Sequence, residues 1–79
     1  MIRTLVKTAA LAIDDHQVDV RYFELRTPRG AKRYSAEILL GPNDRIILDD
    51  DSVTNLETRT TRLVPATLLS RMLARATAA

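Results

Sequence analysis

The sequence contains no cysteine, so neither a disulfide bond nor a thiolate metal site can support its fold. It has a single histidine and only two glycines, which argues against a zinc centre and against a glycine-rich phosphate loop. Only three of its 79 residues are aromatic, so the core must be built from aliphatic side chains that bury less area each. A core of this size is thin, and self-association is an expected source of extra stability.

Acidic residues are absent after Glu57, whereas four arginines follow it. The preceding segment, residues 41–57, contains five acidic residues and one arginine. A small domain with segregated charge can bind a copy of itself, or face a polyanion with one end. The net charge of the whole chain is only +2, which is too small to require a polyanionic partner.

No apolar run approaches the roughly 20 residues of a membrane-spanning helix. Lys7 interrupts the apolar stretch near the start of the sequence, which leaves it too short for the core of a signal peptide. We therefore expect a cytoplasmic protein that does not interact with membranes.

Residues 2–13 predict a helix. Their apolar members recur at spacings of three, four and seven, and alanine is frequent among them. Asp14 and Asp15 follow, and two acids oppose the dipole at a helix C-terminus, so the helix should end there. A first strand is the alternative, but an alternation of period two fits this segment poorly.

The middle of the chain predicts a three-stranded antiparallel meander. Apolar and polar residues alternate over 17–26 and again over 33–40, and a short third strand over 45–48 contains the apolar run 46–48. Residues 27–30 and 41–44 contain proline with glycine or asparagine and predict the two turns.

The segment after the meander allows two interpretations. Thr54 and Glu57 fit a capping box, which favours a helix over about 52–64. Alternating threonines and arginines instead allow a fourth strand over 56–64. Pro65 should end this element and begin a final helix, where its missing N–H costs nothing.

The final helix carries an apolar stripe that includes Met72, with Arg71 and Arg75 on its polar side. We expect the stripe to be mostly core, and any part that the small sheet cannot cover to form a dimer seam. No nearby acid offsets the two arginines. The fold class is therefore α+β: a single domain over residues 1–79, with an N-terminal helix and one or two C-terminal helices packed on one face of the sheet.

One group of basic residues is a candidate binding patch: the 26–33 turn region is basic around a proline and a glycine, and the final helix adds two arginines. The patch comprises Arg26, Arg29, Lys32, Arg33, Arg71 and Arg75. A basic β-hairpin tip can enter a groove of nucleic acid. The alternative is that the tip is charged only because it is solvated and must resist edge pairing.

The acidic residues Asp44, Asp49, Asp50 and Asp51 do not have the spacing of a calcium-binding loop, and an acidic helix start explains most of them. We expect no metal, no cofactor and no catalytic residues. The leading hypothesis is a small non-enzymatic protein-interaction module that forms a homodimer. The alternatives are a nucleic-acid-binding regulator that uses the hairpin tip, and an accessory subunit or inhibitor of another protein.

Overall fold

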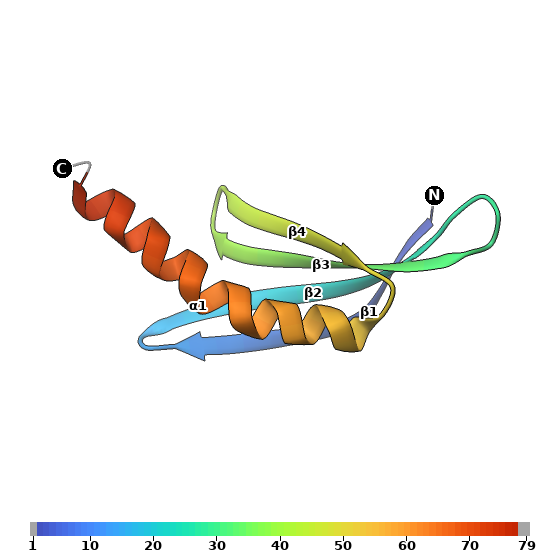
Figure 1. Cartoon of the computed structure of the whole chain (residues 1–79), viewed down its shortest axis with the longest axis horizontal. Helices are drawn as coiled ribbons and strands as arrows, with labels where there is room; N and C mark the ends of the chain where they lie inside the picture. Colours follow the sequence, from blue (N-terminus) through green and yellow to red (C-terminus); the bar gives the residue numbers. More distant parts are fainter. Residues whose placement is uncertain (1, 78–79) are drawn as a thin grey trace.

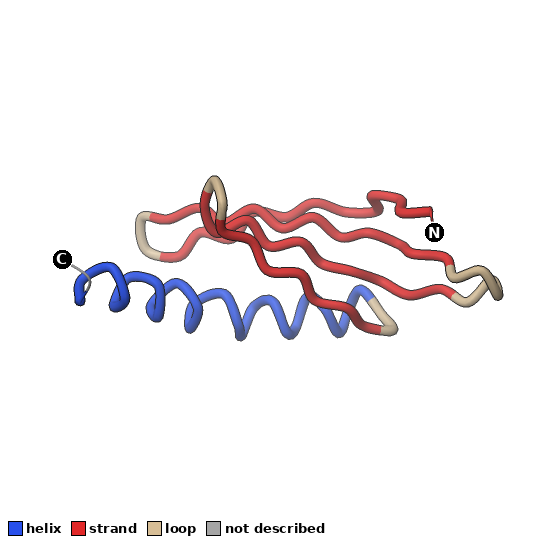
Figure 2. Tube along the Cα trace, turned by 90° about the horizontal axis from the view of Figure 1, so that it is seen from above, coloured by secondary structure: helices blue, strands red, loops and turns tan. Residues whose placement is uncertain are grey.

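The computed structural model describes residues 2–77, which form a four-stranded antiparallel sheet followed by one long helix (Figure 1). The elements are β1 (Ile2–Ile13), β2 (His16–Arg26), β3 (Lys32–Gly41), β4 (Asp44–Asp50) and α1 (Val53–Thr77). The strands lie side by side in the order β1-β2-β3-β4. The helix covers one face of the sheet (Figure 2), and no other helix or strand of the described residues covers the opposite face, which we call the open face.

The predicted N-terminal helix over residues 2–13 is wrong, because this segment is β1 and pairs with β2 along its whole length. A β-bulge between Leu5 and Lys7 explains the error. Leu5 pairs with Phe23 on the open face, whereas Ala9 pairs with Val20 on the face that α1 covers. The bulge thus reverses the alternation midway, so period two is hidden in the sequence. Pairing with β2 overrides the helix propensity of the alanines.

The helix favoured over about 52–64 is confirmed, and the alternative strand over 56–64 is wrong. The strand that joins the predicted meander is instead β1. Pro65 does not separate two helices but lies inside α1. Because it has no N–H to donate to the preceding turn, a bend is expected there, and α1 changes direction about halfway along its length (Figure 1).

The start of α1 is capped by Ser52. Its hydroxyl oxygen accepts a hydrogen bond from the backbone N–H of Asn55 at 3.0 Å. The proposed capping box is therefore wrong: Thr54 is not the cap, and the carboxylate of Glu57 binds Lys7 of β1 at 2.9 Å. This ion pair joins α1 to the edge strand.

The core lies between α1 and the covered face of the sheet. The turns predicted at 27–30 and 41–44 connect β2, β3 and β4 as expected, which places the alternating apolar residues on that face. The buried cluster consists of Val18, Val20, Tyr22, Ala36, Ile38, Leu56, Val64 and Leu68. Only one aromatic ring belongs to it, so the core is mainly aliphatic.

Thr60 lies in this apolar layer with a relative exposure of 1%, and its hydroxyl has no hydrogen-bond partner among the described residues. A buried, unsatisfied hydroxyl carries its full desolvation cost. We expect Thr60→Val to raise the free energy of unfolding by about 1 kcal/mol, because the shape is retained and the polar atom is removed. Thr60→Ala should lower it, since it leaves a cavity. Urea denaturation measures both, and a Val variant less stable than the wild type would contradict the assignment.

Candidate interaction surfaces

The six residues of the predicted basic patch do not form one surface. The molecule is elongated, with dimensions of 49 × 20 × 17 Å. The four basic residues between 26 and 33 belong to the β2–β3 hairpin at one end, whereas Arg71 and Arg75 lie in the last turns of α1 at the other end (Figure 1). The structure therefore divides the candidate patch into two.

At the hairpin end, half of the basic residues already have acidic partners. Arg26 forms an ion pair with Glu24 at 3.3 Å, and Arg33 forms one with Asp51. Arg29 and Lys32 form no ion pair within the described part of the chain. These two exposed cations are the ones available to an external partner.

Arg71 was expected to lack an acidic partner, and this expectation is wrong. Its Nε donates to Oδ2 of Asp44 at 2.9 Å, and its Nη2 lies 3.4 Å from Oδ1 of the same carboxylate. The hydrogen bond and the charge of Asp44 raise the pKa of Arg71. Asp44 precedes Arg71 by 27 residues and lies at the β3–β4 turn, which sequence proximity could not reveal. Arg75 has no ion pair among residues 2–77.

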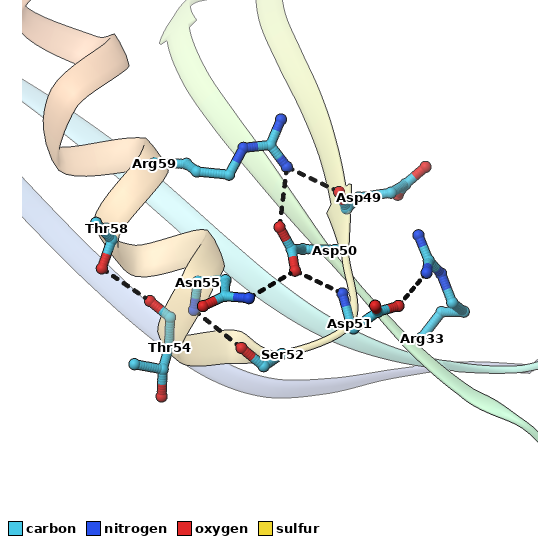
Figure 3. A network of polar contacts seen from close by, with 9 residues as sticks. All are labelled: Arg33, Asp49, Asp50, Asp51, Ser52, Thr54, Asn55, Thr58 and Arg59. Carbon is cyan, nitrogen blue, oxygen red and sulfur yellow. Dashed lines mark hydrogen bonds and ion pairs between the residues drawn. The ribbon is translucent and has the colours of Figure 1, made fainter.

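The acidic run 49–51, at the end of β4, anchors the start of α1 (Figure 3). The carboxylate of Asp50 accepts hydrogen bonds from the Asn55 side chain at 3.1 Å and the Asp51 backbone N–H at 2.7 Å. Arg59 binds it at 3.2 Å and also reaches the backbone oxygen of Asp49 at 2.9 Å. The hydrogen bond from Asn55 is the largest of the effects that lower the pKa of Asp50. Within the described range, no group of three or more His, Asp or Glu residues could hold a metal ion.

The open face of the sheet has an aromatic–arginine contact that the sequence analysis did not identify. Phe23 is only 7% exposed although no helix lies above it. The guanidinium carbon of Arg3 lies 3.8 Å from the centre of its ring, in a cation–π arrangement. The alternation in β2 does place Phe23 on the side opposite Tyr22, but only the bulge in β1 brings Arg3 to the same face.

A second cluster on the open face surrounds Glu37, whose side chain is 5% exposed. Its two carboxylate oxygens face Arg21 of β2 at 3.7 Å and Arg45 of β4 at 3.3 Å. Both arginines remain more than half exposed, so their guanidinium groups face the buried carboxylate while much of each side chain stays in contact with solvent. The cluster links three strands and carries a net charge of +1.

The end of α1 exposes large apolar side chains. Leu69 is 58% exposed, Met72 46% and Leu73 58%. The expectation that the apolar stripe of the C-terminal helix is mostly core is therefore wrong, because these three members of it are exposed. We call these three residues the C-terminal stripe.

No helix in residues 2–77 is long and apolar enough to cross a membrane. Comparison with known proteins found no matching family model, no matching curated protein and no matching solved structure. The surfaces described above therefore carry the functional argument alone.

The hydrogen bonds to Asp50 predict a dependence of stability on pH. Its pKa is lower in the folded protein than the usual value of about 3.9, so the carboxylate stabilises the fold above about pH 4. This contribution should be lost as the pH falls through the lower folded-state pKa. We expect Asp50→Asn to show a shallower loss of unfolding free energy below about pH 4 than the wild type, measured by urea denaturation across pH.

Asn55→Ala tests the cause of the shift. It removes the strongest hydrogen bond to Asp50 and should move the acid transition back towards about pH 4. Identical acid profiles for the wild type and both variants would contradict the role of Asp50.

Proposed function

We propose that this chain is a small non-enzymatic protein-interaction module that works as a homodimer. The proposal assigns no catalytic role, since His16, the sole histidine, is exposed at the β1–β2 turn. Its function in this view is to present surfaces, and a second copy covers one of them.

The excess surface of the monomer supports this proposal. The accessible area is 5643 Å², whereas a compact monomer of 8.9 kDa exposes about 4,800 Å². The radius of gyration is 14.2 Å, compared with about 11.6 Å for a compact domain of this length. The difference in area, about 800 Å², equals the share that one partner contributes to a standard interface.

The state of association tests the proposal directly. Size-exclusion chromatography with light scattering, run over a hundredfold range of protein concentration, should give twice the chain mass at the higher concentrations. Since 8.9 kDa is the monomer mass, the two states are well separated. A constant mass equal to that of one chain over the whole range would rule out the proposed homodimer.

Nucleic-acid binding at the hairpin end is the second candidate, and the Arg3–Phe23 contact favours it. Arg3 pairs with Leu25, and Leu25 pairs with Arg33, so the stacked guanidinium lies on the half of the sheet that leads into the hairpin with Arg29 and Lys32. An arginine plane supported by a ring can stack on an unpaired base, and the two free cations can contact phosphates.

We expect the double variant Arg29→Ala/Lys32→Ala to weaken binding to a fluorescent single-stranded oligonucleotide at about 50 mM salt, and to reduce the salt dependence by about 1.4 in log–log slope, roughly 0.7 per contact. Arg75→Ala is the matched control, because it removes a free arginine at the opposite end of the molecule. No measurable binding by the wild-type protein, or equal losses in the control, would dismiss this candidate.

A further inference from the structure

The last part of α1 extends beyond the sheet. Its 25 residues give a helix about 37 Å long, at about 1.5 Å per residue. Leu68 is the last buried residue of the helix, and residues 69–76 are all exposed. Figures 1 and 2 show this portion of the helix passing the ends of the strands. The sheet therefore supplies no packing for the C-terminal stripe.

The two-point contact between Arg71 and Asp44 fixes the rotation of this overhanging portion. Successive residues of a helix are about 100° apart, so Leu69 and Leu73 each lie about 160° from Arg71 around the axis, and Met72 about 100°. The C-terminal stripe consequently points away from the β3–β4 turn that holds Arg71. Arg75 lies about 40° from Arg71, on the same side, and leaves the stripe uncharged.

We infer that the C-terminal stripe is the seam of the homodimer, and that it packs antiparallel against the same stripe of a second copy. This inference rests on the proposed function. Helical segments without tertiary packing are marginal in water, so an overhang of this length gains most from a partner helix. Leu69, Met72 and Leu73 follow the i, i+3, i+4 spacing by which two helices interdigitate.

Charge favours a second copy in the antiparallel direction. The helix has no acid after Glu57, so a parallel pair would place the two Arg75 side chains next to each other. An antiparallel pair centred near residue 71 separates their positions by about 12 Å along the axis, more than the Debye length of about 8 Å at physiological salt. Each Arg71 keeps its partner Asp44 outside the seam.

The edge strand β1 is the competing surface for a second copy. Its first half is protected against pairing with a strand of another copy, because the bulge distorts the edge and Lys7, which binds Glu57, adds a charge. Its second half, residues 8–13, is uncharged but carries alanine at three of six positions. The first half of β1 does expose Ile2, Leu5 and Val6, but Ile2 and Leu5 lie on opposite faces of the sheet, and the bulge follows Leu5. The three members of the C-terminal stripe instead lie together on one side of one helix.

Substitutions in the stripe test the seam. We expect Leu69→Gln and Met72→Gln each to raise the dimer dissociation constant about tenfold or more, because each dimer carries the change twice. Glutamine is uncharged, as leucine and methionine are, and its helix propensity is similar to theirs. The matched control, Ser70→Gln, changes an exposed neighbour about 100° around the helix from Leu69 and should leave the constant unchanged. Sedimentation equilibrium measures the constants, and far-UV circular dichroism checks the fold.

Cross-linking gives a readout that does not depend on the stability of the variants. Because the chain has no cysteine, Met72→Cys and Ala10→Cys each introduce a single thiol. A short bismaleimide should link the Met72→Cys dimer and leave Ala10→Cys, on β1, unlinked. Cross-linking through Ala10→Cys alone, or a dimer that survives both stripe substitutions unchanged, would overturn the seam but not the homodimer. A strictly monomeric wild type would overturn both.

Discussion

One helix must stabilise a sheet of four strands, and this constraint determines the rest of the structure. The helix can cover only one face, and the core beneath it is mainly aliphatic. Polar contacts between α1 and the margins of the sheet add to the stability that this limited core provides. Lys7 joins the edge strand to α1, Asp50 fixes its start, and Asp44 holds its far end. These exposed ion pairs individually contribute little, but they are distributed along the helix and set its position.

On the open face, side chains of the sheet itself bury two residues that no second layer covers. A ring or a carboxylate on an uncovered sheet face would normally be exposed to water. Here the guanidinium groups of arginines from neighbouring strands contact the ring of Phe23 and the carboxylate of Glu37. Arginine side chains thus partly cover this face, because a guanidinium can stack on a ring or bind a carboxylate while its other donors remain solvated. Phe23 and Glu37 are thus buried without a partner, whereas Leu5 and Ile47 on the same face remain about half exposed.

The limits of sequence-based prediction follow from where the information lies. Alternation within β2, β3 and β4 is local, so the meander could be predicted from residues 17–48. The bulge in β1 reverses its alternation, and only pairing with β2 identifies the segment as a strand. Pro65 is locally a helix breaker, yet packing of Val64 and Leu68 on either side of it keeps α1 continuous. Contacts between distant residues, such as Arg71 and Asp44, have no local signal at all.

The charge segregation of the sequence has a mostly internal explanation. Asp44, Asp50 and Asp51 bind Arg71, Arg59 and Arg33, so the acidic segment neutralises basic residues from three other parts of the chain. Of the basic candidates, only Arg29, Lys32 and Arg75 have no ion pair within the described residues. The apolar excess has no comparable internal explanation, because Leu69, Met72 and Leu73 follow the last buried residue of α1 and remain about half exposed. Association through apolar surface is therefore the stronger inference, and recognition of an anion depends on two cations at one hairpin.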